Sequence, residues 1–157
     1  QPRQERERGR GFDSDRRNHR IDVAFEDLFD VFKLLRVEVS EGDLFAPLTG
    51  RGLEGTMDVV VMNPPYIPST SLEKSHAGLL HHEPRAAFDG GPYGVSVVTR
   101  LLQEAPPFLK EGGHLLFEFG LGQERLVQSL AQRKSLYSEI RFALDAGGSA
   151  RAAILRK

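Results

Sequence analysis

The amino-acid sequence predicts an α/β fold, a doubly wound and mostly parallel sheet that ends in an antiparallel hairpin. The continuous Val-rich run at 58–62 is typical of a strand covered on both faces, and the run at 114–119 predicts another buried strand. A helical spacing of apolar residues lies between them. The hairpin is predicted by two strand-like segments at the end of the chain, joined by turn residues at 145–149. Strands that alternate with helices in this way form an open sheet covered by helices.

The chain begins with a segment that we expect to be a flexible tail. Residues 1–20 carry seven Arg and four acidic residues but one large apolar side chain, Phe12, so they bury too little surface to order themselves. An Arg-rich arm for RNA, or a transit peptide, is the alternative for this tail. Apolar residues spaced by three and four over 21–35 predict an amphipathic helix, and alternation over 36–40 predicts a short strand. The domain is therefore expected to span 21–157.

The middle of the chain holds most of its turn residues. A loop is predicted over 63–92, and a loop of that length inside a compact domain is usually functional or disordered. An apolar stripe over 95–109 predicts the next helix, broken or bent where Pro106 and Pro107 remove backbone donors. A further helix is predicted over 124–134.

Three loops are expected at one rim of the predicted sheet. In open α/β sheets, ligands bind beyond the carboxyl ends of the strands. The loops that follow the predicted strands on that side are 42–43, 63–66 and 118–120. This rim is therefore the predicted functional site.

Composition limits the function classes. At 157 residues and 39% hydrophobic the chain has the size of one domain, and 21 Lys and Arg against 22 Asp and Glu give no overall attraction to nucleic acid or anionic membranes. The absence of Cys excludes disulfides, thiolate zinc sites and cysteine nucleophiles. No apolar run reaches the roughly 18 residues of a membrane span, and the first residues lack the apolar core of a signal peptide. We expect a cytoplasmic protein, or a mitochondrial matrix protein if the source is eukaryotic.

No metal site is expected. His76, His81 and His82 with Glu83 are the densest group of metal-ligating residue types. Their spacing does not resemble a helical zinc pair, in which two ligands share one helix face.

The sequence Asn63-Pro64-Pro65-Tyr66 directly follows a predicted buried strand. Each proline lacks an N–H and fixes φ, so the segment is a stiff, extended bracket whose carbonyls are not used by a helix or a ladder. A planar NH2 group could donate one hydrogen bond to the side-chain oxygen of Asn63 and the other to the main-chain oxygen of Pro64, while Tyr66 offers a flat face for stacking. The plain alternative is a turn that simply ends the strand.

Asp43 is the second candidate. It follows the predicted strand at 36–40 and could accept a hydrogen bond from an adenine amino group. An acid after Gly is also a common turn former or helix N-cap, and that alternative stays open.

Together these segments resemble a known family. The Asn-Pro-Pro-Tyr motif is similar to that of class I S-adenosylmethionine-dependent methyltransferases that act on exocyclic or amide nitrogens, including adenine-N6 DNA methyltransferases. In its context the chain resembles the HemK/PrmC family, which methylates the glutamine of the GGQ motif in peptide-chain release factors. The segments that carry the resemblance are EGDLFAPL (41–48), NPPYIP (63–68), HEPRAAFDGGPYG (82–94), EGGHLLFEFGLGQ (111–123) and DAGGSAR (145–151).

The resemblance implies the roles of the motif. It implies that Asn63, Pro64, Pro65 and Tyr66 form the catalytic bracket. Asn63 and Pro64 would hold the glutamine amide NH2, and Tyr66 would pack on the substrate or the methyl donor. Asn63 would also lie against the donor.

The resemblance also implies a cofactor and a protein partner. S-adenosylmethionine would be the methyl donor, with Asp43 and Leu44 at the position that contacts its adenine. A release factor would be the substrate, with Glu83 and Arg85 in a loop over the active site, where we expect a structural role first and substrate contact second.

The chain departs from the family pattern before residue 41. Proteins of this kind carry a strand that ends in a GxGxG-type loop, and nothing in 1–40 matches it, since Gly9 and Gly11 are flanked by Arg and follow no strand. We therefore expect a partial class I methyltransferase (Rossmann-like) domain without the first strand and the cofactor loop. Two alternatives stay open: an adenine-N6 nucleic-acid methyltransferase, and a non-catalytic regulatory protein with a methyltransferase-like fold. The near-neutral charge and the HEPRAAFDGG segment favour the release-factor enzyme.

Overall fold

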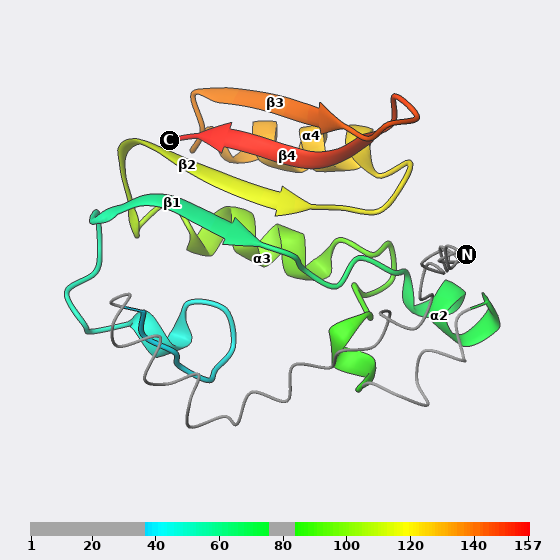
Figure 1. The fold of residues 1–157 in the computed structure, drawn as a ribbon, viewed down its shortest axis with the longest axis horizontal. Helices are drawn as coiled ribbons and strands as arrows, with labels where there is room; N and C mark the ends of the chain where they lie inside the picture. Colours follow the sequence, from blue (N-terminus) through cyan, green and yellow to red (C-terminus); the bar gives the residue numbers. More distant parts are fainter. Residues whose placement is uncertain (1–36, 76–83) are drawn as a thin grey trace, which may run out of the picture. The chain divides into compact units, whose positions relative to one another are not determined.

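The computed structural model describes residues 37–75 and 84–157. Residues 41–157 belong to one compact unit. The predicted tail at 1–20 and the predicted helix at 21–35 lie outside the described residues. In chain order the elements are η1 (Ala46–Leu48), β1 (Met57–Met62), α2 (Ser69–Ser75), η3 (Arg85–Ala87), α3 (Ser96–Glu104), β2 (Leu109–Glu118), α4 (Glu124–Lys134), β3 (Glu139–Leu144) and β4 (Ala150–Arg156) (Figure 1).

The strands form one sheet in the order β1-β2-β4-β3 (Figure 1). β1 pairs with β2 in parallel, and β4 pairs antiparallel with both β2 and β3, so three of the four strands share one direction. The α/β class and the terminal antiparallel hairpin are thereby confirmed. The register places Met62 beside Phe117 and Glu118 beside Ala152, so the ends of β1 and β2 meet the start of β4 at one rim.

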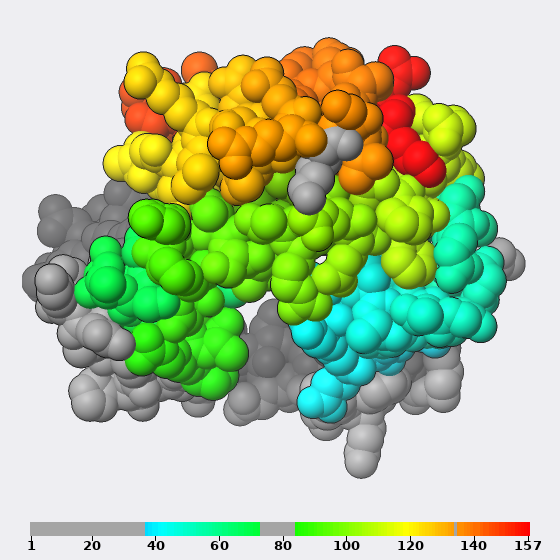
Figure 2. Space-filling view, turned by 180° about the vertical axis from the view of Figure 1, so that it is seen from behind, coloured from blue at the N-terminus to red at the C-terminus, as the bar shows by residue number. Residues whose placement is uncertain are grey.

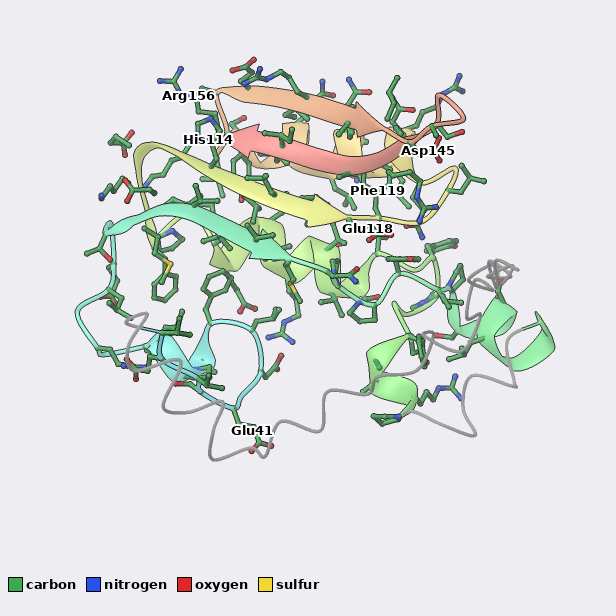
Figure 3. All side chains as sticks on the ribbon, viewed as in Figure 1. Glu41, His114, Glu118, Phe119, Asp145 and Arg156 are labelled. Atoms are coloured by element: carbon green, nitrogen blue, oxygen red, sulfur yellow. The ribbon has the colours of Figure 1, made fainter. Side chains whose placement is uncertain are left out.

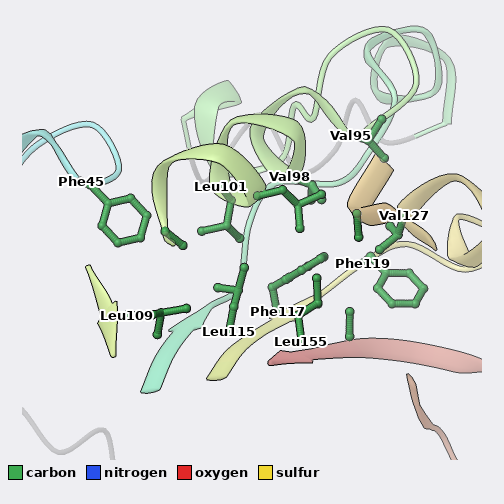
Figure 4. Close-up of a cluster of buried hydrophobic side chains, with 14 of the residues drawn as sticks. Phe45, Val95, Val98, Leu101, Leu109, Leu115, Phe117, Phe119, Val127 and Leu155 are labelled. Atoms are coloured by element: carbon green, nitrogen blue, oxygen red, sulfur yellow. The ribbon is translucent and has the colours of Figure 1, made fainter. Parts of the chain in front are cut away.

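The hydrophobic core lies on one face of the sheet. Alternate side chains of β2, including Leu115 and Phe117, are buried together with residues of α3 and α4 (Figure 4). The helices supply them because apolar residues recur at helical spacing, as with Val98, Leu101 and Leu102 on α3. Figure 2 shows this side, with the yellow and orange surface of α4 and β3 above the green surface of α3.

The prediction that β1 is covered on both faces was wrong for the described residues. Val59 and Val61 are 52% and 72% exposed, whereas Val60 packs against the core. The reason is that α3 and α4 both contribute to the single core, which takes only alternate residues of β1. A continuous apolar run does not show by itself how many faces are covered.

The short strand predicted at 36–40 is also absent where the structure describes it. Residues 37–40 have no regular secondary structure, and Val37 and Val39 are 44% and 55% exposed. Alternation stabilises a strand only when a neighbour pairs with it, and no described strand pairs with this segment. The turn at 42–43 therefore does not follow a strand in the described part of the chain.

The described parts of the segment between β1 and β2 are more ordered than the sequence predicted. The loop expected over 63–92 contains α2 and η3 within its described parts. The expected helix over 95–109 ends at Glu104, because the two prolines that follow cannot continue it. Leu109, predicted to lie on the helix stripe, instead begins β2 and is fully buried.

Candidate active site at the carboxyl ends of β1 and β2

The Asn-Pro-Pro-Tyr segment has two hydrogen-bond acceptors that no described residue uses. It begins directly after the last residue of β1 and has no helix or strand geometry up to Tyr66. Pro64 is fully buried, which anchors the segment to the domain, while Asn63 is exposed. Among the described residues, none donates a hydrogen bond to the Asn63 side chain or to the Pro64 carbonyl. The bracket is thus anchored at Pro64, and its Asn63 side chain is exposed to a ligand, whereas the unpaired Pro64 carbonyl belongs to a buried residue.

A small cavity lies against this bracket. Its volume is about 250 Å³. Ligand pockets for drug-sized molecules span roughly 300–1,000 Å³, so this cavity suits a small planar group. Its walls are Asn63, Pro64, Pro65, Tyr66, Ile67, Ala87 and Phe88.

The second wall of the cavity is fastened to the first by backbone hydrogen bonds. The Ile67 N–H donates to the Phe88 carbonyl at 3.0 Å, and the Gly90 N–H donates to the Ile67 carbonyl at 2.9 Å. The Ser69 N–H donates to the Gly91 carbonyl at 3.0 Å. The segment that follows η3 therefore runs beside the bracket in a fixed register.

The Asp89 carboxylate fixes the same wall through side chains. It accepts hydrogen bonds from Ser69 Oγ at 2.6 Å, Arg85 Nε at 2.7 Å and the Gly91 N–H at 3.0 Å. The Ser69 bond, followed by those of Arg85 and Gly91, lowers the pKa of Asp89 to about 2. Arg85 thus contacts Asp89 in this wall, while its predicted role over the active site and its contact with a protein substrate stay predictions.

Gln123 joins three segments of the rim by hydrogen bonds, and sequence reasoning assigned it no role. Its Nε2 donates to the Tyr66 carbonyl at 2.9 Å and to the Tyr93 carbonyl at 3.2 Å, and its Oε1 accepts from the Gly120 N–H at 2.7 Å. Gly94 lies beside it with φ +72, and an added Cβ there would clash with the Tyr66 carbonyl and Gln123 Nε2. The only sequence signal was that Gln123 ends one of the family-like segments.

Glu118 is the other residue that sequence reasoning did not assign. It is the last residue of β2 (Figure 3), and its Oε1 accepts a hydrogen bond from the Tyr66 hydroxyl at 3.1 Å. The rim loops after β1 and β2 are therefore brought together, as predicted.

Asp43 is held by α3. Both of its carboxylate oxygens accept from Arg100 Nη1, at 3.0 and 3.1 Å, and its side chain is 70% exposed. This hydrogen bond, followed by that to Glu104, raises the pKa of Arg100. The next residue, Leu44, is half-buried against the core and has φ +48, a left-handed backbone that a branched side chain rarely adopts. The 42–44 turn thus combines a strained backbone at Leu44 with an ion pair between Asp43 and Arg100.

The remaining predicted residues lie outside the described part of the chain. Glu83 and the three histidines at 76, 81 and 82 fall in 76–83. Within 37–75 and 84–157 no group of three His, Asp or Glu could hold a metal ion. The helices in those ranges include none long and apolar enough to cross a membrane.

Comparison with known proteins finds several relatives that share one name. No family model matches the chain. The chain is 38% identical over 128 residues to a release factor glutamine methyltransferase of Moorella thermoacetica, covering 82% of this chain and 44% of that protein. It is 36% identical over 110 residues to one of Synechocystis sp., covering 70% and 36%, and 33% identical over 141 residues to one of Caulobacter vibrioides, covering 90% and 47%. The chain thus spans about a third to a half of the length of the curated relatives it matches.

A solved structure with a similar backbone is the E. cuniculi Mtq2-Trm112 complex, described as responsible for methylation of the eRF1 translation termination factor. The TM-score is 0.47 at 18% sequence identity, covering 82% of this chain and 68% of that one.

Proposed function

This chain belongs to the release factor glutamine methyltransferase family, and on that premise we propose that it methylates the side-chain amide of a glutamine in a peptide-chain release factor. The observation that carries the proposal is that Asn63 and Pro64, whose acceptor oxygens receive no hydrogen bond from a described residue, both line the cavity at the rim of the sheet. The GGQ motif is the proposed substrate sequence. The proposed place of action is the compartment in which that release factor works.

The bracket acts on the amide nitrogen. Asn63 Oδ1 and the Pro64 carbonyl would each accept one N–H of the substrate amide, which turns the nitrogen toward the methyl donor and increases its electron density. The aromatic face of Tyr66 closes one side and restricts rotation of the flat amide. In the transfer a nitrogen–carbon bond forms, the sulfur–carbon bond of the donor breaks, and one amide proton leaves to water.

S-adenosylmethionine is the proposed donor, and it supplies an electrophilic methyl group on a sulfonium. The chain offers a fitting acceptor for an adenine amino group in Asp43, since a carboxylate has about four lone-pair sites and Arg100 uses only part of them. The 70% exposure of that side chain leaves it accessible. Asp43 and Leu44 would therefore hold the adenine end, and Asn63 the reacting end.

A transfer assay with two acceptors tests the proposal. The protein is incubated with labelled S-adenosylmethionine and either a release factor or duplex DNA, and a release factor whose GGQ glutamine is changed to glutamate is the matched control. We expect label on the unaltered release factor alone. Label on DNA alone would favour an adenine methyltransferase. Donor binding by calorimetry with no transfer to either acceptor would favour a regulatory role.

A further inference from the structure

The side chain of Tyr66 is held at its hydroxyl and at its ring face. The hydroxyl donates to Glu118 Oε1 at 3.1 Å, and the guanidinium carbon of Arg151 lies 5.8 Å from the ring centroid. A guanidinium over an aromatic face is attracted by the negative charge of the π system. With Gln123 on its carbonyl, Tyr66 is thus fixed at three points.

The two residues that hold the ring are themselves a pair. Arg151 Nη2 donates to Glu118 Oε1 at 3.0 Å, and this bond is the main reason why the pKa of Arg151 is raised. One carboxylate oxygen therefore accepts from both the guanidinium and the phenol. Each partner orients the other, so a substitution of either one should alter the orientation of the Tyr66 ring.

The pair is mounted on rigid backbone. Glu118 is opposite Ala152 in the antiparallel ladder between β2 and β4, and the Phe119 N–H donates to the Arg151 carbonyl at 3.0 Å. Side chains on adjacent strands keep their geometry better than side chains on loops. Glu118 and Arg151, on the paired strands β2 and β4, therefore fix the position of Tyr66, which lies in the segment after β1.

A structural salt bridge is the competing explanation. The side chains of Arg151 and Glu118 are 30% and 39% exposed, and ion pairs this accessible contribute little to stability. A pair at the other end of the sheet offers a comparison, where Lys110 Nζ of β2 lies 2.6 Å from Asp58 Oδ1 of β1. That pair touches no residue of the bracket, so it controls for the loss of an ion pair between sheet positions.

We propose that Glu118 and Arg151 are positioning residues that set the orientation of the Tyr66 ring, and through it the alignment of the amide held by Asn63 and Pro64. This inference rests on the proposed function where it concerns catalysis. The placement of the ring itself does not depend on that function, and the two are tested separately.

The first test reads the ring without requiring activity. The chain contains three Tyr, so ring-labelled tyrosine gives three sets of NMR signals, and Tyr66→Phe identifies one set. We expect Glu118→Gln and Arg151→Gln to shift the Tyr66 signals and to leave those of Tyr93 and Tyr137 in place. Lys110→Gln should move none of the three. Tyr66 signals that stay unmoved in both rim variants would overturn the proposal.

The second test is a double-mutant cycle on methyl transfer. Glu118→Gln should lower kcat about tenfold with KM for the donor within about twofold, because alignment and not binding is lost. In a Tyr66→Phe background the same change should have almost no further effect. If the two losses multiply, Glu118 acts independently of Tyr66 and the proposal fails.

Two outcomes keep the proposals distinguishable. A wild-type protein that transfers no methyl group would end the proposed function, while the ring signals still decide the positioning role. If Glu118→Gln does not fold, Glu118→Asp and Arg151→Lys take its place. Arg151→Lys keeps the charge but loses the planar group, so a smaller shift of the Tyr66 signals is expected than with Arg151→Gln.

Discussion

Two turns of the compact unit carry the predicted chemistry, and they are built in opposite ways. At 63–66 no described residue uses the two acceptors, and two neighbouring side chains, Gln123 and Glu118, hold the backbone and the ring of Tyr66 in place. At 42–44 the candidate group itself, the Asp43 carboxylate, is engaged by Arg100 and stays largely exposed. The first turn is held in place by its neighbours, and under the proposed function the second would have to share its carboxylate between Arg100 and the donor. Changes in the first should therefore affect transfer, and changes in the second should affect donor affinity.

The largest effect is expected from Asn63→Ala. Removing one of two preorganised acceptors should lower kcat for methyl transfer about 10²–10³-fold, the range seen when a single stabilising hydrogen-bond group is removed from an active site. The Kd of S-adenosylmethionine, measured by calorimetry, should change little. Retained transfer would refute the bracket, and a large loss of donor affinity would show that Asn63 acts mainly on the donor.

A pair of glycine substitutions compares a crowded position beside Tyr66 with an open position near η1. Gly94 and Gly50 both have positive φ, but a Cβ at Gly94 meets the Tyr66 carbonyl and Gln123, whereas a Cβ at Gly50 meets nothing within 4 Å. Gly50→Ala should cost about 1–2 kcal/mol of unfolding free energy for the backbone alone. Gly94→Ala should cost about 3 kcal/mol or more, because the steric overlap adds to it. Denaturant melts measure both, and equal losses would show that the rim relaxes around the methyl group.

The predicted adenine contact is tested by Asp43→Ala. Losing one charge-assisted hydrogen bond should weaken donor binding about tenfold, with kcat nearly unchanged. Glu104→Ala is the matched control, since Glu104 is the other acid that binds Arg100, at 3.0 Å. If both variants weaken the donor equally, the effect comes from Arg100 and not from an adenine contact.

The Asp89 contacts predict a dependence on pH. Because the pKa of Asp89 is lowered from 3.8 to about 2, its contribution to stability is complete above pH 3.8 and is lost as the pH falls towards 2. The gap in Tm between the wild type and Asp89→Asn should therefore narrow over that interval. Thermal melts between pH 7 and pH 2 measure the gap, and a constant gap would contradict the assignment.

The sequence predicted the features that depend on neighbouring residues and missed those that depend on contacts between distant segments. Asn63 to Tyr66 was predicted correctly as a rigid segment after a strand, since two prolines determine its geometry without help from the rest of the chain. Glu118 and Gln123 were not assigned, because their bonds to Tyr66 span 52 and 57 residues and depend on how strands pair. The exposure of Val59 and Val61 was missed for a similar reason, since burial of a strand face is decided by which helices cover it.

The smallest effect on thermal stability is expected from Arg100→Gln. The pair with Asp43 is exposed on both sides, 47% and 70%, so water and salt screen it and its loss should change Tm least among these variants. In 1 M salt, where the screening length is about 3 Å, the remaining difference from the wild type should disappear. Donor affinity gives the sharper result. If Arg100 only occupies the carboxylate, Arg100→Gln should tighten donor binding, and if Arg100 orients it, binding should weaken about as much as in Asp43→Ala. A calorimetric titration of the two variants side by side therefore shows whether Arg100 orients the Asp43 carboxylate for donor binding or competes with the donor for it.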